Sequence, residues 1–244
     1  MDGYGPETYG ESFADVYDDW YGVVSDVAAT VAGVVALADG GPVLELGVGT
    51  GRLAIPIAAT GLEVVGVDAS PAMLARLATK PGADAVRAIE ADMAAPPVDA
   101  GHFAVAFAAF NTWFNLTDDA AQQRCAASLA AALRPGGCVA VEAFVPPLEG
   151  MNDGGVSVRN LTADRAVMSV SQHDADAQRI QGHHIDISAA GIVMRPWVLH
   201  YRTPEQLDSL FAAHGFTLER RSADWTGGHL GPESDAHVSV YRLS

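Results

Sequence analysis

Three glycines at alternate positions, Gly47, Gly49 and Gly51, follow a short apolar run in this 244-residue chain. Glycine has no Cβ and readily adopts a positive φ, so a turn built this way lets a ligand approach the backbone closely. A dinucleotide-binding turn would need a further glycine in place of Arg52 to seat a pyrophosphate on the following helix. The turn is therefore poorly suited to an anion, and Glu45, just before it, is placed to face a positive ligand group such as an ammonium.

A second carboxylate, Asp68, ends the next apolar run, residues 63–67. Open α/β sheets bind ligands at the carboxyl ends of their strands, next to the point where the strand order reverses. A carboxylate at such a strand end can accept hydrogen bonds from both hydroxyls of a ribose. The glycine turn and Asp68 together predict a nucleotide-type site.

Apolar runs alternate with stretches of helical period up to residue 143, and this alternation positions the two motifs. The expected strands are 42–46, 63–67, 85–90, 103–107 and 138–143, and the expected helices between them are 52–59, 72–79 and 117–133. Ser70 and Pro71 are typical of an N-cap and a first helical position, and residues 134–137 are expected to end the last helix. The β/α repeats predict a parallel, doubly wound sheet.

The flanking segments have other patterns. Apolar residues recur at helical spacing over 9–38, which predicts one or two helices before the first strand. After Phe144, a connection rich in proline and glycine leads into a segment whose alternation predicts antiparallel strands up to Arg202. A helix capped by Thr203 and a closing pair of strands are expected at 203–214, 216–221 and 237–243.

Four ordered segments resemble the class I S-adenosylmethionine-dependent methyltransferases of the small-molecule type. They are ELGVGTGR at 45–52, VVGVDASPAML at 64–74, EADM at 90–93 and LRPGG at 133–137. The resemblance implies an α/β, Rossmann-like class I methyltransferase fold, with a seven-stranded, mostly parallel sheet, an N-terminal helical segment and an antiparallel β insertion that forms a lid. The insertion resembles the lid region of amino-sugar, glycine-type and peptide N-terminal N-methyltransferases.

We expect one methyltransferase domain over residues 1–244. Its expected parts are an N-terminal helical cap at 1–39, a cofactor-binding core at 40–145, a substrate lid at 146–202, and a closing helix and hairpin at 203–244.

The resemblance implies S-adenosylmethionine as the cofactor and S-adenosylhomocysteine as the product. It implies that the three glycines line the methionine moiety and that Asp68 holds the ribose. It places Met73 near the adenine, Asp92 at the adenine amine and Met93 on the ring. The predicted cofactor site also includes Tyr17, Tyr21, Glu45, Arg52, Ala69 and Ala108.

The N-terminal sequence from Tyr17 to Tyr21 resembles the Y-D-x-x-Y start of small-molecule methyltransferases, in which this helix closes over the cofactor. The two tyrosines are one helical turn apart and can share a face. Both are predicted to contact the cofactor, and Tyr21 is also a predicted catalytic residue. The alternative is an amphipathic helix that buries its aromatic side chains, which we favour for Trp20.

Asn111 and Trp113 follow the fourth strand, at the edge where the transferable methyl would point in this family. Both are predicted to contact the acceptor, and Asn111 is also a predicted catalytic residue. The alternative is that the aromatic side chains here cover the edge of the sheet, which we favour for Phe114.

Three later residues, Trp197, Tyr201 and Trp225, are further predicted acceptor contacts. Trp197 and Tyr201 share one face of an expected strand while His200 lies on the other, so only one set can line a pocket. His200 is the predicted catalytic base, because a near-neutral imidazole can take a proton from an amine or a hydroxyl.

Composition narrows the range of partners. The chain has 14 Lys and Arg against 30 Asp and Glu, a formal net charge of −16, which disfavours nucleic acid and membrane surfaces. The acidic N-terminus is unlike a signal peptide, and Cys125 and Cys138 form no C-x-x-C pair, so we expect a cytoplasmic protein. No metal site is predicted, since the neighbouring His183 and His184 point to opposite faces. A homodimer is possible.

The predicted function is methyl transfer to nitrogen or oxygen of a small-molecule acceptor, a metabolite or natural product. The sulfonium already carries an activated methyl, so catalysis consists mainly of aligning a nucleophile in a desolvated cavity, which contributes roughly 7 to 11 kcal/mol in favourable cases. The alternative is a protein that binds S-adenosylmethionine without methylating, or that catalyses a rearrangement on the same fold. A nicotinamide oxidoreductase is disfavoured by Glu45 and Arg52.

Overall fold

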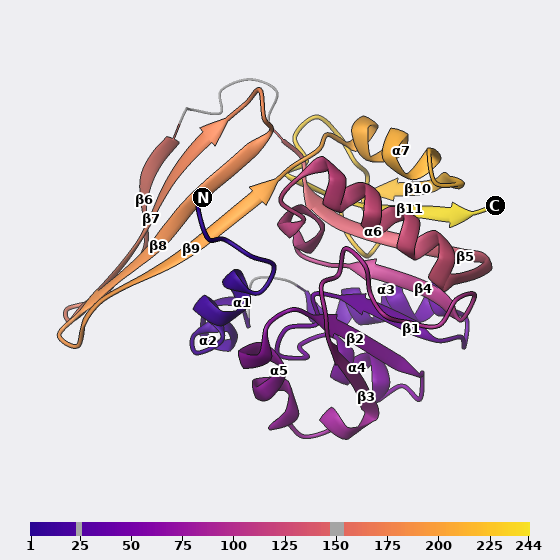
Figure 1. Cartoon of the computed structure of the whole chain (residues 1–244), viewed down its shortest axis with the longest axis horizontal. Coiled ribbons are helices and arrows are strands. Elements are labelled where there is room, and N and C mark those ends of the chain that lie inside the picture. Colours follow the sequence, from indigo (N-terminus) through magenta and orange to yellow (C-terminus); the bar gives the residue numbers. More distant parts are fainter. Residues whose placement is uncertain (23–25, 147–153) are drawn as a thin grey trace.

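The computed structural model describes residues 1–22, 26–146 and 154–244, which form two β-sheets with the N-terminal helices between them (Figure 1). The larger sheet has the strand order β10-β11-β5-β4-β1-β2-β3. Its seven strands are β1 (Val43–Leu46), β2 (Val64–Asp68), β3 (Val86–Glu90), β4 (Phe103–Ala108), β5 (Leu133–Phe144), β10 (Phe216–Ser222) and β11 (Ala236–Leu243). All neighbours are parallel except the pairs that include β11. This confirms the predicted α/β, Rossmann-like fold class.

Helices cover both faces of this sheet, because its central strands are apolar on both sides. Both β1 and β4 are buried along their whole length. The helices are α3 (Val27–Ala38), α4 (Ala54–Ala58), α5 (Pro71–Ala78), α6 (Asp119–Ala132) and α7 (Pro204–Ala212). One core cluster joins the sheet to α6 and α7 through side chains such as Leu129 and Phe211. The cluster on the other face includes Val34 of α3 and Ile57 of α4.

Polar side chains fix where four of these helices begin: Asp26 caps α3, and the other three are α5, α6 and α7. Ser70, Asp118 and Thr203 each accept a hydrogen bond from a backbone N–H in the first turn of α5, α6 and α7. Thr203 also forms a capping box with Gln206. These bonds satisfy N–H groups that have no partner within the helix. The caps at Ser70 and Thr203 are those predicted from sequence.

Two local predictions were wrong. The described residues between 8 and 38 form three helices, α1 (Thr8–Phe13), α2 (Tyr17–Tyr21) and α3, because Asp26 caps α3 and starts a new helix. Residues 134–137 do not simply end α6: they belong to β5, which pairs with β4 through a register shift. A Cβ on Gly137 would lie 3.1 Å from the Phe103 carbonyl oxygen, so the close strand approach requires glycine.

The smaller sheet is antiparallel and has the order β6-β7-β8-β9, which confirms the predicted antiparallel insertion. Its strands are β6 (Gly154–Leu161), β7 (Arg165–Asp174), β8 (Arg179–Ser188) and β9 (Gly191–His200). One face of this four-stranded sheet packs on α1 and α2, where His184 and Arg195 are buried. Of the predicted flexible connection, Pro147 and Gly150 lie outside the described residues.

The helices within the described ranges include none with the length and apolar character needed to span a membrane.

Candidate functional site

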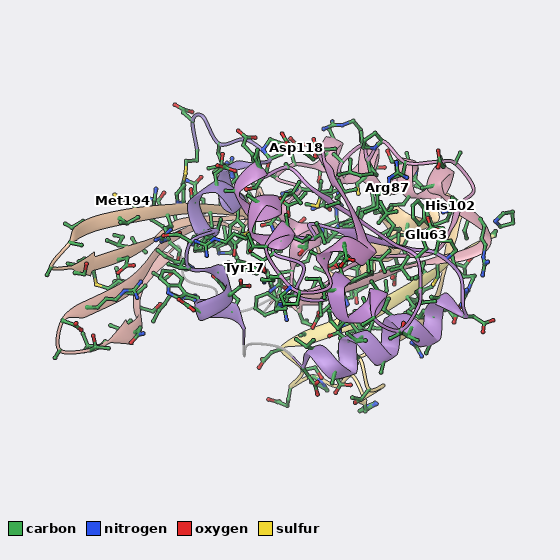
Figure 2. The ribbon with its side chains drawn as sticks, turned by 90° about the horizontal axis from the view of Figure 1, so that it is seen from below. Tyr17, Glu63, Arg87, His102, Asp118 and Met194 are labelled. Atoms are coloured by element: carbon green, nitrogen blue, oxygen red, sulfur yellow. The ribbon has the colours of Figure 1, made fainter. Side chains whose placement is uncertain are left out.

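A cleft of about 590 Å³ lies at the carboxyl ends of β1, β2 and β4, in the size range of roughly 300 to 1,000 Å³ that small-molecule sites occupy. Three parts of the chain line it: loops of the seven-stranded sheet, the N-terminal segment with α1 and α2, and the inner face of the four-stranded sheet. Figure 2 shows Tyr17 of α2 between the two sheets. The position next to the reversal of strand order between β1 and β4 is where such sheets bind ligands.

The glycine loop, residues 47–52, forms the floor of the cleft. Gly47 and Gly49 line the cleft with φ angles of +64° and +54°, which side chains with a Cβ rarely adopt. Gly51 also has a positive φ, but it serves packing: a Cβ there would lie 2.9 Å from the Cγ of Leu77 on α5. Two of the three predicted glycines therefore face the ligand space, and the third lets the loop pack against α5.

Asp68 lies at the end of β2 and lines the cleft. Its two oxygens accept hydrogen bonds from the backbone N–H groups of Gly49 (2.8 Å) and Ser70 (2.9 Å). Burial raises the pKa of this carboxyl against the opposing effect of those bonds. A carboxylate has about four acceptor sites, so Asp68 retains lone pairs for two ligand hydroxyls. Ala69 and Met73 line the cleft beside it.

Asp92 and Met93 line the neighbouring part of the cleft, after β3. One Asp92 oxygen accepts a hydrogen bond of 2.8 Å from the Ala94 N–H, and the Met93 carbonyl accepts one of 3.1 Å from the Cys125 thiol. These bonds orient the turn that carries both residues. The opposite wall, which sequence reasoning missed, comes from the start of α6 and the turn before it: Leu116, Thr117, Asp118, Ala121 and Arg124.

Glu45, Arg52 and Ala108 are not among the residues that line the cleft. Glu45 is buried beneath the glycine loop, and its Oε2 has no hydrogen-bond partner in the described part of the chain. Burial raises the pKa of Glu45 well above its usual value; nearby Arg52 opposes this rise and Asp68 adds to it. Glu45 therefore does not face the ligand space, against the expectation from sequence, and of the two carboxyls only Asp68 lines the cleft.

The N-terminal helices are tied down over the glycine loop. Tyr17 and Tyr21 line the cleft with ring centroids 5.0 Å apart, so they share a face as predicted from their spacing. Asp18, between them, accepts hydrogen bonds from the hydroxyl of Thr50 (2.6 Å) and the ammonium of Lys80 (2.8 Å). Glu11 on α1 accepts a bond of 2.7 Å from the Ser70 hydroxyl. The segment is therefore closed over the loop.

Asn111 lies in a strained turn after β4, where Phe110 and Asn111 both have positive φ angles of 47° and 65°. The turn is held by β5: the Phe110 N–H donates to the Glu142 carboxylate (2.8 Å), and the Asn111 side-chain oxygen accepts from the Phe144 N–H (2.7 Å). Phe110 and Asn111 line the cleft and also a second cavity of about 350 Å³. Trp225 lines that second cavity and not the cleft.

Of the residues predicted on β9 and just beyond it, Trp197 lines the cleft together with Leu199, whereas His200 and Tyr201 do not. The His200 ring bonds to the Asp119 carboxylate (2.7 Å), and the Tyr201 hydroxyl to the His173 ring (2.8 Å). His200 points to the start of α6 because alternate side chains of a strand face opposite sides. The geometry thus removes His200 from the reacting space.

Trp113 is also placed away from the cleft. It is fully buried in the core between the sheet and α6, and its indole N–H donates to Gln122 Oε1 (3.2 Å). Its packing matches the alternative that aromatic residues here cover the edge of the sheet.

Arg159, Ser169 and His184 line the cleft from the four-stranded sheet and were not predicted as site residues. His184 is 6% exposed, and its Nδ1 has no hydrogen-bond partner within the described residues. Burial, with a further contribution from the positive charge of Arg159, lowers the pKa of His184 to about 4, so the ring is neutral. The sequence held one sign of His184, which alternates along its strand with the residues of an apolar face. The alternation does not tell which of the two faces meets the cleft.

Within the described ranges, no group of three or more His, Cys, Asp or Glu side chains is arranged to hold a metal ion.

The residues of the cleft fit S-adenosylmethionine. Gly47 and Gly49 line the cleft, the space where a Cβ on Gly49 would point is open, and Asp68 has acceptor capacity left for ribose hydroxyls.

Comparison with known proteins agrees with this fit. A family model described as a methyltransferase domain matches residues 43–137. The cypemycin N-terminal methyltransferase of a Streptomyces species is 31% identical over 185 residues, which cover 72% of this chain and 73% of that protein. The structure of the CcbJ methyltransferase from Streptomyces caelestis superposes with a TM-score of 0.92 at 36% identity, covering 99% of this chain and 100% of that one.

The S-adenosylmethionine-bound CalS10, an amino pentose methyltransferase from Micromonospora echinaspora, superposes with a TM-score of 0.69 at 25% identity, covering 94% of this chain and 97% of that one. The motifs, the fold and these relatives agree. It belongs to the class I S-adenosylmethionine-dependent methyltransferases, and S-adenosylmethionine is its cofactor.

Proposed function

We propose that this enzyme methylates the nitrogen of an amine on a small-molecule acceptor, a metabolite or natural product. The observation that carries the choice of nitrogen over oxygen is the acceptor wall of the cleft, formed by the N-terminal segment and the four-stranded sheet. Among the described residues, this wall contains no carboxylate: its polar members are Tyr4, Tyr9, Tyr17, Tyr21, Arg159, Ser169, His184 and Trp197.

Methylation of an alcohol or phenol needs a base to take the hydroxyl proton. The imidazole of His184, with a pKa of about 4, is too weak for this task, and burial raises the pKa of Tyr17 to about 12, so Tyr17 stays protonated. A neutral amine attacks with its own lone pair and needs no base at that moment. The wall is therefore suited to an amine that has lost its proton to water before binding.

The proposed roles on the cofactor side follow the contacts in the cleft. Asp68 holds the ribose hydroxyls, Asp92 and Met93 border the adenine, and Gly47 and Gly49 border the methionine part. When bound, the cofactor supplies a methyl group activated by the sulfonium. The nitrogen–carbon bond forms as the sulfur–carbon bond breaks, and the proton on the product nitrogen is later released to water.

The remaining residues position the acceptor. The unpartnered Nδ1 of His184 accepts a hydrogen bond from an amine N–H, which orients the nitrogen lone pair. Because the ring is neutral, it adds no positive charge beside the sulfonium. Tyr17 and Tyr21 close the cleft and exclude water, which strengthens the electrostatic interactions inside. Positioning by His184 replaces the expectation that His200 acts as a base.

A small-molecule acceptor is supported by the limited volume of the cleft and by the relatives. CalS10 is an amino pentose methyltransferase, whereas the cypemycin enzyme is an N-terminal methyltransferase. We also propose that the enzyme works in the cytoplasm, as supported by the two cysteines, Cys125 and Cys138, which are both free and buried.

The test is formation of S-adenosylhomocysteine by the purified protein with panels of small amines, amino sugars, peptides with a free N-terminus, phenols and alcohols. We expect turnover with small amines, with the methyl located on nitrogen by tandem mass spectrometry. Turnover only with phenols or alcohols would overturn the choice of nitrogen, and turnover only with peptides would overturn the small-molecule class. Tight cofactor binding without turnover in any panel would favour the alternative of a protein that binds S-adenosylmethionine without methylating.

A further inference from the structure

The four-stranded sheet has a second face, opposite the cleft, that we call the outer face. Residues paired directly across neighbouring strands share a face, and residues two apart along a strand do so too. The pairing therefore defines three rows of four side chains on the outer face. They are Leu161, Ala166, Ile187 and Ile192; Val158, Met168, Ile185 and Met194; and Val156, Val170, His183 and Pro196.

Every position in these rows except His183 is apolar, and the rows contain no Asp, Glu, Lys or Arg. The face is open to water in a single copy: Leu161 is 71% exposed, Ile192 67% and Val158 64%. The figures show no described helix or strand over it; Met194 lies where the sheet projects away from the seven-stranded sheet (Figure 2). Single exposed apolar residues are normal in soluble proteins, but a continuous apolar sheet face marks an interaction site.

We propose that the outer face packs against the outer face of a second copy of this chain. Charge is the first reason. Each copy has a formal net charge of −16, so most ways of bringing two copies together place like charges side by side. The outer face is a surface where two copies can meet without opposing carboxylates. The same charge disfavours an anionic membrane as the occupant.

Geometry is the second reason. Two β-sheets with apolar faces pack about 10 Å apart with their strands inclined by roughly 30°. A two-fold axis that lies between the two faces and parallel to them lets identical surfaces cover each other, which is the commonest arrangement in homo-oligomers. In this arrangement the rows of one copy interdigitate with the rows of the other, as in the core of a β-sandwich.

Area sets the expected strength. Strands about 4.8 Å apart and rows about 7 Å apart give an apolar face of roughly 400 Å² per copy. A standard stable interface buries about 800 Å² per partner, so the apolar rows supply about half of that area and their rim must supply the rest. We therefore expect a dimer that dissociates in the micromolar range, not a permanent one.

Pairing also affects the proposed acceptor wall, because the same strands carry Ser169, His184 and Trp197 on their inner face. A sheet packed on both faces is held more rigidly than one with a face in water. The dimer therefore stabilises the wall on which the acceptor lies.

The test is sedimentation velocity on the full chain from about 1 to 100 µM, a range that brackets the expected dissociation constant. The double variant Val158→Asp/Ile192→Asp places four carboxylates in the interface. We expect the dissociation constant of the dimer to rise by about 100-fold or more. Leu218→Asp is the matched control, since Leu218 is also exposed but lies on β10 of the other sheet. Circular dichroism and S-adenosylmethionine titration check that each variant is folded.

A second variant tests the contact without adding charge. Met194→Cys introduces a thiol on the outer face, whereas the native Cys125 and Cys138 are buried. We expect a short flexible bis-maleimide, which spans the roughly 10 Å between packed sheets, to cross-link two copies of Met194→Cys and not two copies of Leu218→Cys. A wild-type chain that stays monomeric up to about 100 µM, or a dimer that survives the two aspartates unchanged, would overturn the proposal.

Discussion

The Asp18 carboxylate on α2 accepts a hydrogen bond of 2.6 Å from the Thr50 hydroxyl in the glycine loop. The same carboxylate accepts a bond of 2.8 Å from Lys80, just beyond the end of α5. One side chain thus connects the segment that covers the cleft with the loop that forms its floor. Burial opposes the ionised form of Asp18, but these two bonds and the positive charge of Lys80 outweigh burial and lower the pKa of Asp18. The carboxylate is therefore ionised at neutral pH.

Asp18→Asn should loosen this closure while leaving the cleft residues in place. The amide keeps one acceptor oxygen but loses the ion pair with Lys80, so we expect S-adenosylmethionine to bind about 5- to 20-fold more weakly, mainly through faster release. Stopped-flow tryptophan fluorescence measures the release rate. Asp19→Asn is the matched control, because exposed Asp19 has no hydrogen bond or salt bridge among those found in the described residues. Equal release rates for both variants would contradict a closing role for Asp18.

Asp68→Ala should remove most of the affinity for the cofactor. The substitution deletes the proposed ribose acceptor and two bonds that shape the loop, those from Gly49 and Ser70. We expect at least about 100-fold weaker binding of S-adenosylmethionine and S-adenosylhomocysteine by calorimetry, because two ribose hydroxyls lose a charged acceptor and each such hydrogen bond contributes about 1.5 to 3 kcal/mol. Asp68→Asn, which keeps one acceptor oxygen, should be intermediate. Full affinity in Asp68→Ala would show that the ribose lies elsewhere.

The cofactor side of the cleft was accessible from sequence because each of its residues lies within a few positions of a strand end. Gly47, Gly49, Asp68 and Asp92 follow β1, β2 and β3, and the carboxyl ends of parallel strands meet at one edge of the sheet. Local order along the chain was enough to place them together. Glu45 and Arg52 belong to the same segment but are not among the lining residues, which local spacing does not reveal.

The acceptor side was less accessible because it depends on how a separate sheet docks. A shift of one residue in register exchanges the two faces of a strand. His200 and His184 lie on neighbouring strands, and only the packing of that sheet on α1 and α2 decides that His184 meets the cleft. Trp225 and Asn111 were both predicted to contact the acceptor, but the turn after β4 separates a second cavity, which Trp225 lines, from the cleft.

His184→Gln and His200→Gln should change different properties of the enzyme, turnover in the first and stability in the second. His184→Gln removes the proposed partner of the amine, so we expect kcat/KM for the acceptor to fall by about 10- to 100-fold with little change in cofactor affinity. His200→Gln breaks the contact with Asp119 outside the cleft and should lower the free energy of unfolding by about 1 kcal/mol while keeping turnover. Steady-state kinetics and urea unfolding measure the two effects. Loss of turnover only in His200→Gln would restore His200 as the catalytic histidine.

Acid should destabilise the fold through two buried histidines, His184 and His237. Burial lowers the pKa of His184 and of His237 to about 4 in the folded chain, against 6.5 for an ordinary histidine. Between these values the unfolded chain binds a proton at each site and the folded chain does not, so stability falls as pH decreases from 6.5 to 4. The loss is on the order of 3 kcal/mol per histidine at pH 4.

Urea unfolding at a series of pH values measures this loss, and a His184→Gln/His237→Asn variant should show a shallower decline over the same interval.

Turnover should depend on pH in a different way from stability. Because the imidazole of His184 is already neutral above about pH 5, it should add no inflection to kcat/KM at neutral pH. The rate should instead rise with pH, following the deprotonation of the acceptor amine. An inflection near pH 6.5 that disappears in His184→Gln would contradict the neutral state assigned to this ring.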